Sequence, residues 1–273
     1  MRVVPIACLS DNYAYLLVCP ETKEAAIIDP SEPDPVLRAL SENDGRNGDV
    51  KVVAILDTHH HPDHVGGNTE VAKALGITRV YGHASDKGRI PSQTELVEEG
   101  ASFTIGSLLV RVLHIPGHTT GAVAYVVTRE PHDALVFTGD TMFIGGCGRI
   151  FEGDPPMMHA SLTKLAKLDG RTQVYCGHEY TESNLRFAAH VEPSNPAIAT
   201  ARARAAELRK DGKPTVGATI ADELTYNPFL RVKSPEIRKT LGIPENASDA
   251  EALGAIRKAK DNFPASGITP RVR

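Results

Sequence analysis

Four of the eleven histidines of this chain lie within six positions, in the segment "DTHHHPDHVGG" that starts at residue 57. His59 and His61 are two residues apart at the end of an expected strand, where extended backbone turns alternate side chains to one face. The same alternation turns His60 the other way. Asp63 and His64 follow at the turn into the next expected helix. Imidazole nitrogen and carboxylate oxygen at this spacing suit a borderline divalent ion such as zinc.

One metal ion needs at least three protein ligands, so a second ion requires ligands from outside this segment. Three candidates follow later expected strands, and each stands beside a glycine that permits a tight turn. They are His118, Asp140 and His178. Seven candidate ligands on four loops are enough for two ions that share one carboxylate. Ordinary surface or core positions are expected for the other histidines, which are His60, His83, His114, His132, His159 and His190.

Short strands mixed with a few helices are expected to position these ligands. The run "KVVAIL" at 51–56 is continuously apolar, as in a strand buried on both faces, and it leads straight into the histidines. Helical spacing follows in "GGNTEVAKALG", which ends at Gly76. Further strands are expected at "TRVYG", "LLVRVLHI", "VAYVVT", "ALVFTG" and "QVYCG". This pattern predicts an α/β domain.

The character of the chain changes near residue 180. The segments "ESNLRFAAHVEP", "NPAIATARARAAELRKDG" and "DAEALGAIRKAKDNF" have helical spacing with capping and stop signals and little strand propensity. We therefore expect an α/β domain over residues 1–180 and a smaller helical domain over residues 181–273.

Composition excludes several classes of protein. The 273 residues carry a net charge of −4 with interspersed signs, which argues against a nucleic-acid-binding surface. The N-terminus lacks the pattern of a signal peptide, and no run approaches the roughly 20 apolar residues that span a bilayer. We expect a cytoplasmic protein, a monomer, whose scattered cysteines are buried thiols in a reducing compartment. These cysteines are Cys8, Cys19, Cys147 and Cys176.

The pattern T-H-x-H-x-D-H, followed by glycine-flanked His, Asp and His, resembles the metallo-β-lactamase superfamily of dinuclear hydrolases. This resemblance implies an αββα sandwich with the metal site at one edge. Members of the superfamily cleave thioesters, lactams, lactones and phosphodiesters, and some oxidise sulfur. The motif therefore indicates fold and metal more strongly than substrate.

Almost the whole chain is similar to one branch, glyoxalase II, the hydroxyacylglutathione hydrolases. The similar segments are "LSDNYAYLL", "GDTMFIGGCGRIFEG", "CGHEYTESNLRFA", "NPFLR" and "IRKAKDNF". The resemblance implies two divalent metal ions. Zinc is the ion most expected here, and iron and manganese suit the same ligands. The resemblance assigns the first ion to His59, His61 and His118, the second to Asp63, His64 and His178, and the bridge to Asp140. Asp63 and Asp140 are the carboxylates that it implies in catalysis.

The resemblance also implies which residues bind the substrate. The glutathione-binding positions fall on Arg149, Tyr180, Arg257 and Lys260, and Phe151 stands where some members have Tyr. Arginine and lysine would hold the carboxylate of the glycine end through charge-assisted hydrogen bonds. Without the resemblance, the "RKAK" segment would be interpreted as a solvated helix face. Some members also carry Lys at the position of Arg149, which puts affinity in question rather than reaction type.

The implied reaction is hydrolysis of S-D-lactoylglutathione to D-lactate and glutathione, the second step of methylglyoxal detoxification. Two cations lower the pKa of water, so no serine or cysteine nucleophile is required. The alternatives are a mononuclear iron persulfide dioxygenase of the same superfamily and a non-catalytic metal-binding protein. Two interpretations of Asp57 remain: it is a partner of a ligand imidazole, or it is a surface-facing loop residue.

Overall fold

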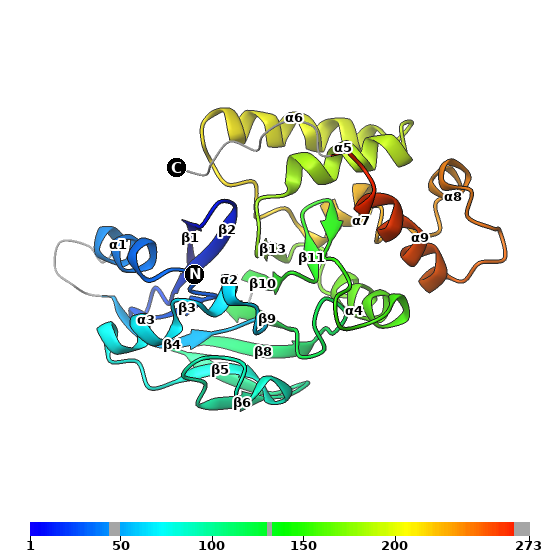
Figure 1. Cartoon of the computed structure of the whole chain (residues 1–273). Coiled ribbons are helices and arrows are strands. Elements are labelled where there is room, and N and C mark those ends of the chain that lie inside the picture. Colours follow the sequence, from blue (N-terminus) through cyan, green and yellow to red (C-terminus); the bar gives the residue numbers. More distant parts are fainter. Residues whose placement is uncertain (44–49, 130–132, 265–273) are drawn as a thin grey trace. The chain divides into compact units, whose positions relative to one another are not determined.

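The computed structural model describes residues 1–43, 50–129 and 133–264, so that His132 lies outside the described residues. The chain folds into two compact units, which can be followed in Figure 1. Within the described part, the first unit comprises residues 1–114 and 121–139. The second comprises residues 115–120 and 140–264.

The first unit contains a mixed sheet whose strands follow one another in chain order. They are β1 (Arg2–Cys8), β2 (Asn12–Val18), β3 (Glu24–Ile28), β4 (Lys51–Leu56), β5 (Val80–His83) and β6 (Glu95–Val97). Strands β1 to β3 pair antiparallel, and β3 to β6 pair parallel. All seven residues of β2 are buried, as are the last three of β4. Burial on both faces explains why β2 after Asn12 and β4 after Lys51 are continuously apolar instead of alternating.

This unit also holds four antiparallel strands of a second sheet, in the order β10-β9-β8-β7. These strands are β7 (Ser102–Ile105), β8 (Leu108–His114), β9 (Val123–Arg129) and β10 (Asp133–Gly139). Aromatic rings join the facing sides of the two sheets. Tyr15 lies 5.3 Å from Phe137, and Tyr81 stacks on Phe103 with ring centroids 4.0 Å apart. The core of the first unit therefore includes a layer between two sheets.

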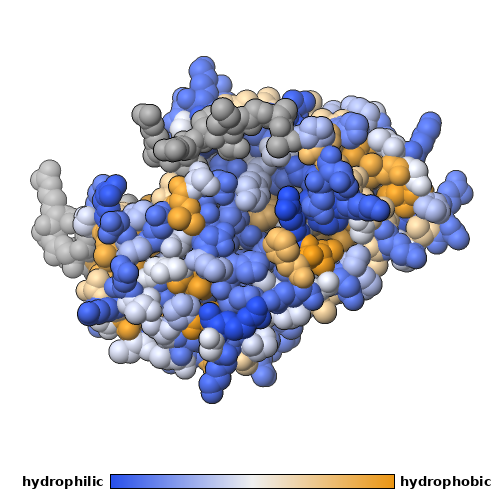
Figure 2. Space-filling view, viewed as in Figure 1, coloured by the Kyte–Doolittle hydropathy of each residue, from blue (hydrophilic) through white to orange (hydrophobic). Residues whose placement is uncertain are grey.

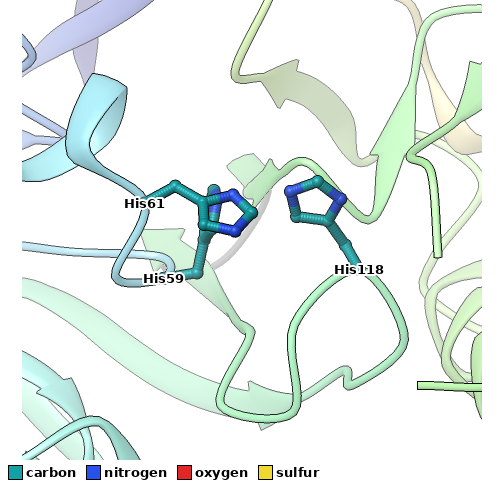
Figure 3. Close-up of side chains that lie close together, drawn as sticks. All are labelled: His59, His61 and His118. Atoms are coloured by element: carbon teal, nitrogen blue, oxygen red, sulfur yellow. The ribbon is translucent and has the colours of Figure 1, made fainter. Parts of the chain in front are cut away.

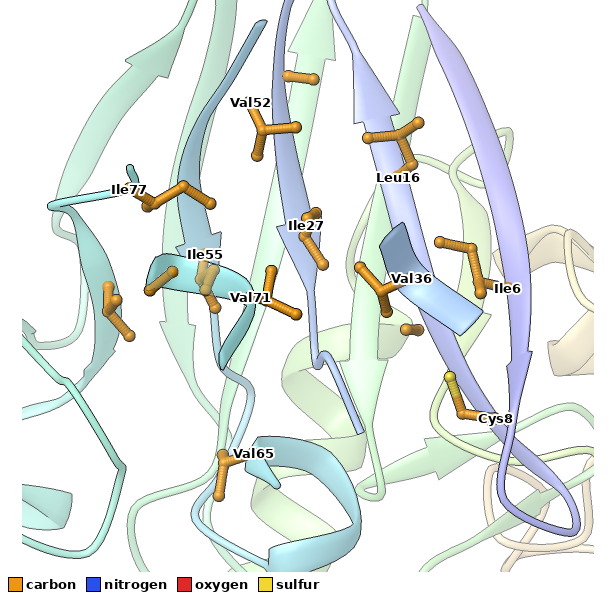
Figure 4. Close-up of a cluster of buried hydrophobic side chains, with 14 of the residues drawn as sticks. Ile6, Cys8, Leu16, Ile27, Val36, Val52, Ile55, Val65, Val71 and Ile77 are labelled. Atoms are coloured by element: carbon orange, nitrogen blue, oxygen red, sulfur yellow. The ribbon is translucent and has the colours of Figure 1, made fainter. Parts of the chain in front are cut away.

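Helices cover the other face of the first sheet. They are α1 (Pro33–Asn43), α2 (Pro62–Val65) and α3 (Asn68–Leu75), and a 3₁₀ helix follows at Ala84–Asp86. Figure 4 shows Val36 of α1 and Val71 of α3 among the valine, leucine and isoleucine side chains of the sheet. Gly76 ends α3 in the left-handed conformation, as its sequence predicts. The sheet and its helices confirm the expected α/β class.

The second unit is mainly helical. Its described residues contain the short strands β11 (Met142–Phe143), β12 (Gly146–Cys147) and β13 (Gln173–Cys176), and six helices: α4 (Pro155–Ala166), α5 (Thr181–Val191), α6 (Pro196–Lys210), α7 (Ile220–Tyr226), α8 (Pro235–Leu241) and α9 (Asp249–Asp261). Capping boxes start α7 at Thr219 and α9 at Ser248. The sequence patterns predict α5, α6 and α9, whereas α4, α7 and α8 become evident only in the structure.

Polar side chains cover most of the face of the molecule in Figure 2, and hydrophobic side chains gather there in small groups. Among the described residues, the exposed large hydrophobic side chains are Leu9, Leu96, Leu109, Phe151, Tyr180 and Leu224. Two of these, Phe151 and Tyr180, are candidate substrate-binding residues. Over the same residues, every helix is too short or too polar to cross a bilayer.

Candidate metal centre

The loop that follows β4 carries four of the candidate ligands. His59 and His61 follow the end of the strand, and α2 begins directly after His61, which has extended backbone angles of −61° and 140°. The Nε2 atom of His59 lies 3.1 Å from Nδ1 of His61. Asp63 and His64 lie inside α2, where Asn12 donates a hydrogen bond of 3.0 Å to the Asp63 carboxylate. The strand end and the short helix therefore gather four donors in six positions.

A buried carboxylate supports the imidazole of His64. Nδ1 of His64 lies 2.9 Å from Oδ2 of Asp29, and both residues are almost fully buried. The backbone N–H and the hydroxyl of Thr58 each donate a 2.7 Å hydrogen bond to the same carboxylate. Because an ionised carboxylate can only accept, Nδ1 of His64 carries the proton and Nε2 is the nitrogen suited to a metal. The sequence patterns did not identify Asp29, which directly follows the buried apolar run at 25–28.

His60 lies against a different acid. Its Nδ1 atom is 3.1 Å from Oδ1 of the buried Asp86, and Arg89 contacts its ring from the other side. Among the described residues, His60 takes part in none of the groups of donor atoms close enough to share an ion. This arrangement agrees with the strand alternation that turns His60 away from His59 and His61.

Asp57 is fully buried, so that its interpretation as a surface-facing loop residue is wrong. The amide of Asn68 donates a 2.7 Å hydrogen bond to its carboxylate, and the hydroxyl of Tyr125 donates to its backbone carbonyl. Burial, reinforced by the negative charge of Asp29, raises the pKa of Asp57 well above its ordinary value. Asp57 belongs to the support of the ligand loop and not to the group of candidate ligands.

The second unit carries the other three candidate ligands. Nδ1 of His118 donates a 2.8 Å hydrogen bond to the backbone carbonyl of Arg149, which leaves Nε2 as the nitrogen suited to a metal. The Oδ2 atom of Asp140 lies 3.5 Å from Nε2 of His118 and 3.2 Å from Nε2 of His178. All three residues are buried. One carboxylate oxygen and two imidazole nitrogens thus converge in this unit.

The seven candidates form three overlapping groups whose donor atoms lie within 4.8 Å of one another. These groups are His59, His61 and His118; His59, His64 and Asp140; and Asp63, His64 and His178. Figure 3 shows the imidazole rings of the first group pointing toward one another. Nitrogen and oxygen donors at this spacing, most of them buried, fit divalent ions of the zinc type. The His and Asp clusters therefore suit a dinuclear metal site.

Two aromatic candidates for substrate contact lie on the ligand histidines of the second unit. The ring of Tyr180 stacks on that of His178 at 4.8 Å, with an interplanar angle of 5°. Phe151 lies 5.2 Å from the ring of His118 and is 62% exposed. Because both aromatic rings are exposed beside candidate ligands, they can contact a molecule that approaches these histidines.

The three cationic candidates differ in exposure. Arg149 has 65% of its side chain exposed, whereas Arg257 of α9 is only 7% exposed. The ammonium group of Lys260 donates to the backbone carbonyl and to the hydroxyl of Ser183, and it lies over the rings of Phe187 and Phe263. Burial and the nearby charge of Arg257 lower the pKa of Lys260 to about 8. The "RKAK" segment is therefore not simply a solvated helix face.

The cysteines beside these motifs are not poised as nucleophiles. Cys147 and Cys176 are buried, and burial raises the pKa of their thiols to about 11 and about 12. Since only the thiolate is strongly nucleophilic, both groups stay inert near neutral pH. This agrees with the structural role expected for them.

Two protein families together match nearly all of the chain. Residues 10–178 match the metallo-beta-lactamase superfamily, and residues 179–263 match the hydroxyacylglutathione hydrolase C-terminus. A hydroxyacylglutathione hydrolase of Methylococcus capsulatus is 44% identical over 263 residues, which cover 96% of this chain and 99% of the relative.

Solved structures are similar as well. ETHE1 from Myxococcus xanthus aligns with a TM-score of 0.64 and 25% identity, over 95% of this chain and all of its own. TTHA1623 in a di-iron-bound form aligns with a TM-score of 0.52 and 34% identity, over 65% of this chain and 92% of its own.

Proposed function

The chain belongs to the hydroxyacylglutathione hydrolases of the metallo-beta-lactamase superfamily, and on this premise we propose that it hydrolyses S-D-lactoylglutathione and related S-2-hydroxyacylglutathiones. The products are a 2-hydroxy acid, here D-lactate, and glutathione. The expected fold, a metallo-β-lactamase domain followed by a helical domain, is confirmed. One observation carries the proposal: the seven-residue ligand set and the matching helical C-terminus occur in one chain.

We propose that two divalent ions bind the seven candidate ligands. His59, His61 and His118 hold one ion, Asp63, His64 and His178 hold the other, and Asp140 bridges them. When bound, such ions lower the pKa of water to near neutrality and polarise a carbonyl group. Zinc fits these nitrogen and oxygen donors, and iron or manganese fits them as well. The di-iron form of TTHA1623 supports the second possibility in a related fold.

The protein's own part in the reaction is to hold donors in one protonation state and one orientation. The Asp29 carboxylate and the Arg149 carbonyl keep the proton of His64 and of His118 on Nδ1. Asp63 and Asp140, the carboxylates of the set, supply negative charge that offsets part of the charge of two cations, and we assign catalysis to them. With both cysteine thiols protonated, the attacking group is water.

We propose that the glutathione part of the substrate contacts Arg149, Phe151, Tyr180, Arg257 and Lys260. Phe151 and Tyr180 provide exposed rings next to His118 and His178. The cations attract the carboxylates of the tripeptide. A phenylalanine at position 151 cannot donate the hydrogen bond of a tyrosine, so this contact is apolar.

The domain boundary near residue 180 stays a prediction, and the change of matching family at residues 178–179 supports it. A cytoplasmic location is likewise proposed, because the four cysteines are buried and form no disulfide among the described residues. Monomeric state and absence of nucleic-acid and membrane partners stay predictions from composition.

The test is hydrolysis of S-D-lactoylglutathione, followed by release of the free thiol, beside metal analysis of the same sample. We expect turnover to rise with metal content toward two ions per chain, and to be much slower with a small thioester that lacks the tripeptide. Absence of hydrolysis with several thioesters on metal-replete protein favours the non-catalytic alternative. Oxygen consumption with glutathione persulfide favours the dioxygenase alternative.

A further inference from the structure

The buried guanidinium of Arg257 is bound on two sides by other groups of the second unit. One Nη1–H donates a 2.7 Å hydrogen bond to the backbone carbonyl of Cys147, which is 110 positions earlier in the chain. Nε and Nη2 both donate to Oδ1 of Asp261, one turn along α9, at 3.2 and 2.9 Å. The ring of Phe229 covers the group at 5.2 Å. This geometry fixes Arg257 against a particular point of the backbone.

Cys147 is the first residue of a segment, Cys147–Arg149. Helix α9 also contacts the last residue of this segment, Arg149. Oδ1 of Asp261 lies 3.6 Å from Nε of Arg149. Asp261 thus interacts with Arg257, which binds the carbonyl of Cys147, and with the side chain of Arg149. Both ends of a three-residue segment are connected to one turn of a helix.

The Cys147–Arg149 segment in turn contacts two candidate metal ligands. The carbonyl of Arg149 accepts the 2.8 Å hydrogen bond from Nδ1 of His118. Gly148 packs so closely that an added Cβ atom would lie 1.9 Å from the backbone oxygen of Asp140 and 3.1 Å from Nδ1 of His118. Only glycine fits there, so a small shift of the segment must move the carbonyl that orients His118.

We infer that Arg257 and Asp261 are positioning residues for the metal ligand His118, and that they act through the Cys147–Arg149 backbone. The inference rests on the proposed function in that His118 is taken as a ligand. It assigns Arg257 a role beyond the substrate contact. Arg257 is 7% exposed, and three of its nitrogens already donate to groups of the protein. Its main role is therefore to hold the Cys147 backbone in place. Arg149 and Lys260 remain the more accessible cations.

Metal affinity tests the inference without any substrate. Arg257→Lys keeps the charge, but an ammonium lacks the planar fork that reaches Cys147 and Asp261 together. Asp261→Ala leaves Arg257 attached to the Cys147 carbonyl alone. Lys258→Ala, at an exposed position of the same helix, is the matched control. Each protein is loaded with zinc, and the affinity for each ion is measured by chelator competition after thermal unfolding has shown that it is folded.

Loss of a partner that orients a ligand lowers metal affinity about 10- to 100-fold. We expect a loss of at least about tenfold for one ion in Arg257→Lys, with the control unchanged. A smaller loss in Arg257→Lys overturns the inference. If that variant is not folded, Asp261→Ala decides by the same criterion, since its side chain is 40% exposed and its removal disturbs packing little.

The outcome is separable from that of the proposed function. Failure of wild-type protein to hydrolyse S-D-lactoylglutathione removes the proposed substrate and leaves the metal measurement intact. Normal zinc affinity in Arg257→Lys removes the positioning role, whatever the substrate is. Lys260→Met adds a contrast, because Lys260 contacts Ser183 and not the Cys147–Arg149 segment, and its zinc affinity should match that of the control.

Discussion

The candidate ligands of the His59–His64 loop and the later candidate ligands of the second unit are contacted by different chemical groups. In the loop, the carboxylate of Asp29 binds His64, and the carboxylate of Asp86 lies 3.1 Å from Nδ1 of the neighbouring His60. In the second unit, a backbone carbonyl binds His118. A side-chain partner can be removed by one substitution, whereas a carbonyl can be displaced only by moving the backbone that carries it.

This difference determines which substitutions can disturb each half of the candidate site. In the loop, the candidate ligand His64 depends on the buried carboxylate of Asp29, which a single substitution of nearly equal size can replace. In the second unit, His118 depends on the Cys147–Arg149 segment and therefore on contacts with α9. We expect the largest losses of metal and turnover from substitutions at candidate ligands, smaller losses at residues that orient them, and the smallest at neighbouring residues.

The largest effect is expected for Asp140→Asn. A neutral amide cannot supply the anionic bridge between two cations, so one ion should be lost or weakly held. Metal catalysis is worth several kcal/mol, and each 1.4 kcal/mol is a factor of ten, so turnover should fall by about a thousandfold or more. Metal analysis and thiol release measure the two losses on one sample.

Asp211→Asn is the control for charge, because Asp211 pairs with Lys213 at the surface. It should retain both ions and full turnover. Wild-type metal content together with wild-type turnover in Asp140→Asn would show that the bridging assignment is wrong.

Asp29→Asn should have the next largest effect, on the loop half of the site. Asp29 has a positive φ of 48°, a conformation that asparagine tolerates, so the backbone is expected to stay in place. Loss of the charge behind His64 should lower the affinity for one ion about 10- to 100-fold. Chelator competition measures it, with Asp34→Asn on the surface of the same unit as control.

The comparison of the two halves is sharpened by combining variants. Asp29→Asn and Arg257→Lys should weaken different ions, so the double variant should lose affinity for both. If both single variants weaken the same ion, the assignment of His64 and His118 to separate ions is contradicted.

A smaller effect, on substrate alone, is expected for Lys260. Its pKa of about 8 lies below the ordinary value, so the ammonium that attracts a carboxylate is lost as the pH rises through 8. We expect kcat/KM for S-D-lactoylglutathione to fall above about pH 8. In Lys260→Met, KM should rise about tenfold with kcat nearly unchanged, since a hydrogen bond to a charged group is worth about 1.5 kcal/mol or more.

The pH profile separates this role from a structural one. Lys260→Met should lack the decline above pH 8, and a small thioester without the tripeptide should show no decline even in the wild type. Rates are corrected for hydrolysis without enzyme. A decline that persists in Lys260→Met must come from another group.

The smallest effect on activity is expected for His60→Ala. Because His60 faces Asp86 and not the candidate ligands, turnover should stay within about twofold of wild type. A factor of two is a small change in activation free energy, since about 1.4 kcal/mol gives a factor of ten. Loss of the partner of a buried carboxylate should lower the free energy of unfolding by about 1–3 kcal/mol. Denaturant unfolding measures this loss, with His159→Ala of α4 as control. A large loss of turnover in folded, metal-loaded His60→Ala would mean that His60 belongs to the site.

Much of the candidate site followed from residues close together in the sequence. The spacing of His59, His61, Asp63 and His64 and the apolar run at 51–56 predict a strand that delivers donors to one place, and the structure has this strand and loop. Caps and periodicity likewise predict α5, α6 and α9. These features depend on the alternation of strands and on the 3.6-residue repeat of helices, which neighbouring residues determine.

Only the tertiary structure determined which groups contact and orient the candidate ligands. Asp29 lies 35 positions from His64, Arg149 lies 31 from His118, and Arg257 lies 110 from Cys147. Periodicity carries no information about such pairs, and a backbone carbonyl has no side-chain identity to be recognised. The burial of Asp57 is of the same kind, because desolvation depends on every element packed around a group. The sequence by itself thus determined the donors and their spacing, and only the folded chain determined which groups orient them.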